Sequence, residues 1–357
     1  MLFATSIASG ILSAIFIHLI IKHSSKLGLI DRPTDRSMHK KPIPRGAGIG
    51  FVSASFIGIA ASVIFNIYSS KEYALIYFAI AIVFLAGIID DKKSVLPRLK
   101  FLFIIIAATM VSFDGIYIKS LGNFSTFEIT LPYYLAIPFT IFAITGFTNA
   151  LNLIDGLDGL AASLSVALFT VFLWIGFSYN DDLMIILSSI FLCTTFAFLF
   201  FNWHPAKVFM GDSGSLTLGF VISILAVRAT DYLEATAVLF IVVLPVLDTF
   251  IVMVRRKQRG LSLFSPDKTH IHHILYKRYE DVSYTVILLL YIQVAFMLIG
   301  IQLKDSDGLI NLILFGILFF IMLILFDQRK KKRKKEKKRA FLSKNHPPNK
   351  TKSASQN

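Results

Sequence analysis

Charge is scarce in this sequence, and cysteine is almost absent. Only 16% of the 357 residues are Asp, Glu, Lys or Arg, while 55% are hydrophobic, which excludes a soluble globular domain. The single cysteine, Cys193, lies in an apolar run, so the sequence offers neither an intrachain disulfide nor a cysteine metal site. The first apolar run has no basic residue before it and ends at Lys22, not at a small-residue cleavage site, so we expect no cleavable signal peptide.

An excess of basic residues is found only at the carboxyl end. The chain has 36 basic and 22 acidic residues, and 13 of the basic but only two of the acidic ones fall within 327–357. The rest of the chain is nearly balanced, so its charge does not indicate a nucleic-acid partner, and we expect none. We predict a single transmembrane domain over 1–327 and a basic, disordered cytoplasmic tail over 328–357.

Long apolar runs make up most of the chain. A helix needs about 17 to 25 mainly apolar residues to cross roughly 30 Å of hydrocarbon. Eleven such runs lie near 2–21, 46–68, 73–89, 99–113, 132–150, 160–178, 183–201, 214–230, 235–254, 284–302 and 309–326. The sequence therefore predicts an all-α polytopic membrane protein with about eleven transmembrane helices and no internal repeat.

The loops between these runs differ in charge. If the N terminus lies outside, the cytoplasmic loops and tail collect 32 basic residues and the outer loops keep four, so we predict the N terminus outside and the C terminus in the cytoplasm. The longest outer segment, 114–131, alternates apolar and polar residues around Gly122-Asn123. This alternation predicts a β-hairpin on the outer surface.

Acidic residues gather at the cytoplasmic mouths of the predicted helices. Asp90 and Asp91 end the third span, Asp155 and Asp158 lie between the fifth and sixth, and Asp212 opens the eighth. Charge near a membrane is costly, so this placement indicates function. Adjacent carboxylates suit a metal ligand beside a base, although a pair of solvated residues at a helix end would look the same.

Two of these acidic segments have a further pattern. In Asn149-Ala-Leu-Asn152-Leu-Ile-Asp155-Gly-Leu-Asp158-Gly, polar residues recur every three positions and share one face of a helical turn; simple turn chemistry is the alternative. Gly211-Asp212-Ser213-Gly214-Ser215 places backbone donors at a helix start, where a phosphate is favoured, while Asp212 offers oxygen to a hard cation such as Mg²⁺. An ordinary helix cap is the alternative there.

A histidine cluster and one acidic residue lie in and after the ninth predicted span. His270, His272 and His273 are expected to donate to phosphate oxygens or to relay protons. No cysteine or separated HxxxH completes a zinc site, so we expect no zinc. Asp248, inside the span, is expected to face the bundle interior, and both a substrate contact and a structural hydrogen bond stay open for it.

These motifs together resemble those of the polyprenyl-phosphate N-acetylhexosamine-1-phosphate transferase superfamily, glycosyltransferase family 4. The likeness runs over roughly 28–275 and includes Asp31-Arg-Pro and 39–45, while Arg45-Gly-Ala-Gly departs from the Arg-x-Gly-Gly more usual in relatives. His-Ile-His-His is similar to the branch that uses UDP-N-acetylglucosamine, whereas relatives that transfer phospho-N-acetylmuramoyl-pentapeptide typically carry three consecutive histidines. Eleven spans and an outer N terminus also resemble the first branch.

The resemblance implies a reaction and a location. N-acetylhexosamine-1-phosphate, with N-acetylglucosamine-1-phosphate expected, would pass from a UDP-sugar to undecaprenyl phosphate with release of UMP, at the cytoplasmic face of a bacterial cytoplasmic membrane. Direct attack by the lipid phosphate and a covalent aspartyl intermediate both stay open, as does a homodimer. The alternative, a transporter or flippase for an anionic solute, would need polar residues in several spans, and Asp248 alone is clearly of that kind.

The resemblance also implies roles for individual residues. Mg²⁺, with Mn²⁺ as a substitute, would be bound by Asp212 with Asp90. The implied catalytic residues are Asp90, Asp91, Asp155, Asp158, His270, His272 and His273. The implied substrate-binding residues are Asn149, Asn152, Lys41, Arg45, Asp248, Arg255 and Arg256.

Overall fold

The structure, a computed structural model, describes residues 1–33, 41–93, 95–258, 260 and 270–326. The chain separates into two compact units, Met1–Phe315 and Gly316–Asn357. The described part of the second unit is the later half of the last helix, and the predicted tail over 328–357 lies outside the described residues.

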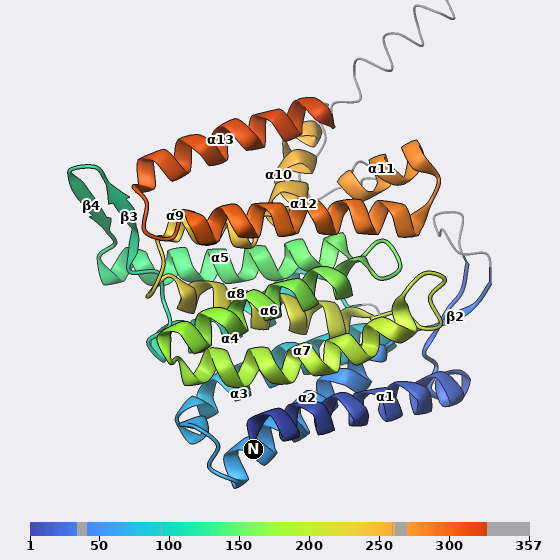
Figure 1. The fold of residues 1–357 in the computed structure, drawn as a ribbon. Coiled ribbons are helices and arrows are strands. Elements are labelled where there is room, and N and C mark those ends of the chain that lie inside the picture. Colours follow the sequence, from blue (N-terminus) through green and yellow to red (C-terminus); the bar gives the residue numbers. More distant parts are fainter. Residues whose placement is uncertain (34–40, 94, 259, 261–269, 327–357) are drawn as a thin grey trace, which may run out of the picture. The chain divides into compact units, whose positions relative to one another are not determined.

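Helices account for nearly all of the described elements (Figure 1). They are α1 (Leu2–Leu27), α2 (Ala47–Ile64), the 3₁₀ turn η1 (Ser70–Tyr73), α3 (Ala74–Lys92), α4 (Pro97–Phe113), α5 (Tyr133–Ile154), α6 (Leu160–Tyr179), α7 (Asp182–Asn202), α8 (Asp212–Ala229), α9 (Ala235–Ile241), α10 (Val243–Gln258), α11 (Ile271–Tyr279), α12 (Val282–Gln302) and α13 (Gly308–Leu325). Two antiparallel pairs complete the fold: β1 (Ile30–Asp31) with β2 (Ile43–Pro44), and β3 (Ser120–Phe124) with β4 (Phe127–Thr130).

All eleven predicted spans are helical, and the chain is a multi-pass membrane protein. Among the described residues, nine helices are long and apolar enough to cross a membrane, and the bent pair α9 and α10 would be a tenth if it forms one span. The remaining predicted span is α4, which has 17 residues and so extends for only about 25 Å.

The ninth predicted span, 235–254, is not one straight helix. α9 and α10 meet at an angle of 86°. Pro245, in the first turn of α10, has no N–H to give to the carbonyl of Ile241. The buried side chain of Gln293 on α12 repairs the break, because its Nε2 donates to Ile241 O at 2.6 Å and its Oε1 accepts from Leu244 N at 3.1 Å. Lipid could not satisfy these backbone groups, so the break depends on α12.

The predicted hairpin over 114–131 is confirmed, but its turn lies elsewhere. The strands reverse at Ser125 and Thr126 and not at Gly122-Asn123. Two acidic side chains from distant parts of the chain fix this register: Asp307 accepts from Ser125 N at 2.5 Å, and Glu234 accepts from the backbone and the amide of Asn123. The sequence pattern alone contained no sign of these contacts.

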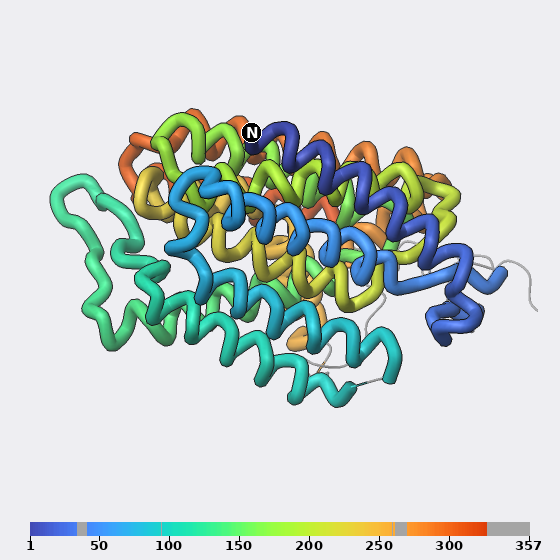
Figure 2. Tube along the Cα trace, turned by 90° about the horizontal axis from the view of Figure 1, so that it is seen from below, coloured from blue at the N-terminus to red at the C-terminus, as the bar shows by residue number. Residues whose placement is uncertain are grey.

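The helices of residues 1–315 have two distinct ends. β3 and β4 lie at one end and the β1–β2 segment at the other, as both views show (Figures 1 and 2). We call them the hairpin end and the site end. α8 begins at the site end, is mostly buried, and packs against α2, α3 and α5.

Glycines on α2 and α3 let the start of α8 come close. A Cβ at Gly48 would meet the backbone N of Gly214, and one at Gly87 would meet the backbone of Asp212 and Ser213. Any side chain at either position would therefore displace the start of α8, which carries Asp212. The absence of a side chain at these two glycines therefore lets the carboxylate of Asp212 take its position.

Candidate active site

A cavity of about 890 Å³ lies at the site end. It brings together all five acidic residues that the sequence predicted to gather, with Asn152 and Arg45. The acidic residues that line it, among those described, are Asp31, Asp90, Asp91, Asp155, Asp158, Asp212, Glu280 and Asp281. The basic residues and histidines of the lining are Arg45, His204 and His273. An anionic ligand can bind beside so many carboxylates only with compensating cations.

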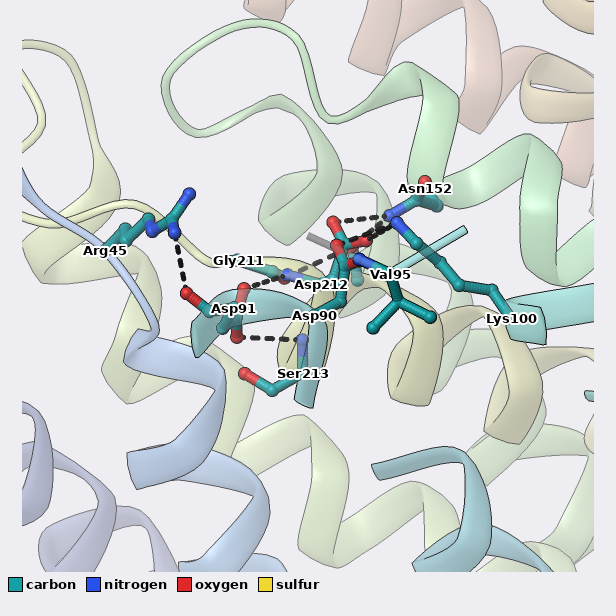
Figure 3. Close-up of polar contacts among 10 residues, drawn as sticks. Arg45, Asp90, Asp91, Val95, Lys100, Asn152, Gly211, Asp212 and Ser213 are labelled. Atoms are coloured by element: carbon teal, nitrogen blue, oxygen red, sulfur yellow. Dashed lines mark hydrogen bonds and ion pairs between the residues drawn. The ribbon is translucent and has the colours of Figure 1, made fainter. Parts of the chain in front are cut away.

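Asp91 holds the start of α8 (Figure 3). Its Oδ1 accepts from Asp212 N at 2.7 Å and its Oδ2 from Ser213 N at 3.1 Å, so one carboxylate satisfies two of the N–H groups that a helix start leaves unpaired. The side chain of Asp91 is buried, and Arg45 Nη2 donates to its backbone oxygen at 2.6 Å. Asp91 therefore positions Asp212 and the loop before it.

Asp90 and Asp212 share one ammonium group. Lys100 Nζ lies 2.7 Å from Asp90 Oδ2 and 2.5 Å from Asp212 Oδ2 (Figure 3). Val95 N donates to the other oxygen of Asp90 at 2.7 Å, and Asn152 Nδ2 lies 3.2 Å from Asp212 Oδ1. These two carboxylates thus converge on a point where a cation is already stabilised.

The two carboxylates fit the divalent cation that the resemblance implies. Carboxylate oxygens are the hard donors that Mg²⁺ prefers, and Asp90 Oδ2 and Asp212 Oδ2 both reach a single positive group. Sequence reasoning counted Lys100 only as a cytoplasmic positive charge. Its proximity to Asp90 comes from the packing of α4 against α3, which the motif spacing alone did not indicate.

Asp155 and Asp158 have different surroundings although they lie in one loop. Asp158 Oδ2 accepts from Ala206 N at 3.1 Å and pairs with His204 Nδ1 at 2.7 Å, so it holds the segment that leads to Asp212. Burial raises the pKa of Asp155 to about 7, and the negative charges of Asp212, Asp158 and Asp91 add to this. A pKa near 7 suits Asp155 to exchange a proton near neutral pH.

The histidine cluster divides between the cavity and the interior. His273 lines the cavity, whereas His270 and His272 are buried and are not part of its lining. His270 Nδ1 lies 2.6 Å from Asp248 Oδ2, and Asp248 Oδ1 accepts from Ile271 N at 2.5 Å. The expectation that Asp248 faces the interior is confirmed.

Asp248, His270 and His272 also form a trio that could hold a metal ion. Their ligand atoms lie within 4.8 Å of one another. The sequence argument against zinc considered only ligands near the histidines and missed that α10 supplies a third. The 2.6 Å between Asp248 Oδ2 and His270 Nδ1 is a hydrogen-bond distance, and burial lowers the pKa of His272 to about 3, which keeps its imidazole neutral.

Five of the implied substrate-binding residues do not line the cavity, and one of them is Asp248, described above. Asn149 lies on α5 one turn before Asn152, and Lys41 is exposed before β2. Arg255 and Arg256 are buried on the last turns of α10 and have polar or electrostatic contacts there. His204 is a lining residue that sequence reasoning missed, although its place between the seventh and eighth spans puts it on the side of Asp212.

Comparisons with known proteins agree with the motifs. Residues 73–230 match the model of the family described as glycosyl transferase family 4. The chain is 35% identical over 316 residues to a Bacillus subtilis protein named probable undecaprenyl-phosphate N-acetylglucosaminyl 1-phosphate transferase, with 87% of each chain covered. It is 30% identical over 323 residues to decaprenyl-phosphate N-acetylglucosaminephosphotransferase of Mycobacterium tuberculosis, covering 78% of this chain and 76% of that protein. It is 28% identical over 274 residues to undecaprenyl-phosphate alpha-N-acetylglucosaminyl 1-phosphate transferase of Yersinia pestis, covering 74% and 73%.

Proposed function

The chain belongs to glycosyl transferase family 4, and we propose that it transfers N-acetylglucosamine-1-phosphate from UDP-N-acetylglucosamine to undecaprenyl phosphate and releases UMP. The observation that carries this proposal is the pair Asp90 and Asp212, which line an acidic cavity at the ends of membrane helices and converge on the ammonium group of Lys100. The names of the relatives support a polyprenyl phosphate as acceptor and N-acetylglucosamine-1-phosphate as the transferred group.

The reaction exchanges one phosphoanhydride bond for another. An oxygen of the lipid phosphate attacks the phosphorus that bears the sugar, the bond from that phosphorus to the UMP oxygen breaks, and UMP leaves with the electron pair. The lipid carries away a diphosphate linked to the sugar. Catalysis of such a transfer is mostly positioning and stabilisation of charge.

Cation chemistry follows from the carboxylates. Mg²⁺, for which Mn²⁺ would substitute, would be held by Asp212 and Asp90 and would offset the charge of the diphosphate. Lys100, which neutralises the same two carboxylates, would be a further donor to a phosphate oxygen. Arg45 and His273 line the cavity as further donors to the anionic donor substrate.

We propose direct attack by the lipid phosphate. Asp90 and Asp91 are poorly placed to form a covalent aspartyl intermediate, because both oxygens of Asp91 hold the start of α8 and both oxygens of Asp90 accept hydrogen bonds. The second pKa of a phosphate monoester is about 6, so the acceptor is mostly dianionic at neutral pH. Little help from a base is needed.

The distribution of charge supports a cytoplasmic location of the site end. With the site end in the cytoplasm, the loops obey the 32-to-4 distribution of basic residues, and the soluble donor meets the lipid acceptor at the surface of a bacterial cytoplasmic membrane. The donor is made of polar groups and the acceptor of a long apolar chain. A cavity at the ends of membrane helices serves both.

The test is formation of product in detergent. Purified protein with radiolabelled UDP-N-acetylglucosamine, undecaprenyl phosphate and Mg²⁺ should give a lipid-soluble labelled product and UMP in equal amounts, and omitting the lipid should abolish both. UDP-N-acetylmuramoyl-pentapeptide should give no product, because the chain has Ile271 within its histidine motif. Preference for the pentapeptide donor would overturn the branch, and absence of turnover with either donor would overturn the reaction.

A further inference from the structure

The carboxylate of Asp248 on α10 holds the start of helix α11. Asp248 is 1% exposed; its Oδ1 accepts from Ile271 N, and its Oδ2 lies 2.6 Å from His270 Nδ1. His270 is the residue before α11, and its own side chain makes no cap hydrogen bond to the helix. Asp248 therefore does from a neighbouring helix what a capping residue usually does from within the chain.

These two hydrogen bonds also fix the orientation of His270. A proton on Nδ1 faces the carboxylate, so only Nε2 is available to other partners. A buried carboxylate that accepts two hydrogen bonds is a strong anchor, because losing the carboxylate leaves two donors without their partner. The first turn of α11 thus depends on Asp248.

On its other side, α11 rests against the loop of Asp155. A Cβ at Gly156 would meet Nε2 of His272, so this buried imidazole lies directly on the loop backbone. The rings of His272 and His273 have centroids 4.3 Å apart, and His273 lines the cavity. α11 therefore lies between the anchor at Asp248 and the loop that carries Asp155.

We propose that Asp248 is a positioning residue for donor binding: it holds α11 so that His273 reaches into the cavity and His272 supports the loop of Asp155. The inference rests on the proposed function for the identity of the donor. It assigns different tasks to the three histidines. His273 touches the substrate, His270 ties α11 to Asp248, and His272 is a neutral spacer against Gly156.

The proposal makes a statement about metal as well. If the carboxylate of Asp248 is a hydrogen-bond acceptor, the trio Asp248, His270 and His272 binds no structural metal. Metal analysis of the purified protein after exchange into chelator-free buffer should find well under one zinc per chain. One zinc per chain that is lost in Asp248→Asn would overturn the proposal, because the carboxylate would then be a metal ligand.

The main experiment is a double-mutant cycle between Asp248 and His273. Asp248→Asn keeps the shape of the side chain and removes its charge, and His273→Ala removes the group placed in the cavity. Each single variant should raise the KM for UDP-N-acetylglucosamine by about tenfold, the scale of one lost charged hydrogen bond. The KM of the double variant should stay within about twofold of the higher of the two single-variant KM values, because Asp248 acts through the position of His273.

A merely structural role gives a different pattern. If Asp248 only stabilises the fold, the two effects multiply to about 100-fold, or the KM for undecaprenyl phosphate rises in parallel. Either result would overturn the inference. Asp305→Asn, which removes the charge of a carboxylate that is 77% exposed, is the matched control and should change neither KM.

Binding separates this inference from the proposed function. Calorimetric titration with UDP-N-acetylglucosamine in Mg²⁺ buffer measures donor affinity without turnover. The titration uses the wild type, the two single variants and the double variant. Wild-type binding without any UMP release would refute the proposed reaction while the cycle in Kd still tests Asp248. Multiplying effects on Kd would refute the role of Asp248 while UMP release by the wild type leaves the reaction standing.

Discussion

The two ends of the helices of residues 1–315 handle buried charge in opposite ways. At the hairpin end, Arg228 Nε lies 2.6 Å from Asp181 Oδ2, and Asp231 pairs with both Arg228 and Lys119. Two acidic residues there meet two basic ones. Tyr232 donates to Asp181 at 2.6 Å, and Asp181 also caps α7 through Met184 N.

The site end has no such balance among its described lining residues. Eight acidic side chains surround the cavity, with one arginine and two histidines. The pairing of Asp181 and Asp231 with Arg228 and Lys119 at the hairpin end serves stability. Even with Lys100 beside Asp90 and Asp212, acidic groups outnumber basic ones around the cavity. This excess favours a further cation, and the difference from the hairpin end indicates a site for a cation and an anionic substrate.

The largest effect is expected at Asp212. Asp212→Asn keeps the shape of the side chain but removes the anionic donor to the cation, so turnover should fall by about 10³-fold or more. UMP release across a range of Mg²⁺ concentrations measures it. Near-normal activity at ordinary Mg²⁺ would remove Asp212 from the cation site.

Asp90→Asn and Asp91→Asn should each lower turnover by about 10²-fold, for different reasons. Asp90 is expected to act on the cation, so raising Mg²⁺ should restore part of its activity. Asp91 positions Asp212 through two backbone hydrogen bonds, so extra Mg²⁺ should not help. Equal rescue of both variants would contradict this division, and variant protein levels in the membrane serve as the control.

Lys100→Met should cost about tenfold in turnover while tightening cation binding. The ammonium competes with a cation for the same two oxygens, and methionine preserves the apolar stem without the charge. The Mg²⁺ concentration for half-maximal activity should therefore fall. A rise in that concentration would mean that Lys100 supports the cation and does not compete with it.

At the hairpin end, Arg228→Gln should destabilise the protein and spare its chemistry. The side chain of Asp181 is fully buried, and removing one partner of a buried ion pair costs about 3 kcal/mol. Thermal unfolding in detergent should shift downward by several degrees, while kcat and both KM values stay at wild-type levels. Loss of kcat at a temperature where the variant is folded would contradict the separation of the two ends.

The smallest effect is a pH dependence of stability. Burial raises the pKa of Asp155 to about 7, above its ordinary value of 3.8, so the folded protein binds a proton that the unfolded chain releases. The contribution of Asp155 to the free energy of unfolding is present in acid and is lost as pH rises through about 7. In EDTA, wild-type Tm should fall by about 2 °C more than that of Asp155→Asn between about pH 5 and about pH 8. Equal Tm shifts in the wild type and Asp155→Asn would mean that a group other than Asp155 titrates in this range.

The sequence identified which residues gather but not what most of them do. Apolar length and loop charge predicted the spans because a bilayer imposes them locally. The roles of Asp91 and Asp158 depend on partners 121 and 48 residues away, and such contacts leave no mark in a motif. Pro245 was visible in the sequence, yet the bend it permits needs Gln293 from α12.

The histidine motif shows the same limit. The three histidines were predicted to act together because they are neighbours in the chain. One of them lines the cavity, while His270 and His272 turn toward Asp248, which lies 22 residues from His270. Sequence spacing alone could not predict which histidine faces the cavity and which faces Asp248. α11 is a short helix, and the elements that pack on it determine which of its faces are buried.

Cation binding tests the contrast between the two ends most directly. Purified protein titrated with Mn²⁺ and followed by electron paramagnetic resonance should bind one tightly held ion per chain. That ion should be lost in Asp212→Asn, weakened in Asp90→Asn and retained in Arg228→Gln. Tight Mn²⁺ binding that survives in Asp212→Asn would contradict the assignment of the acidic surplus at the site end to a catalytic cation.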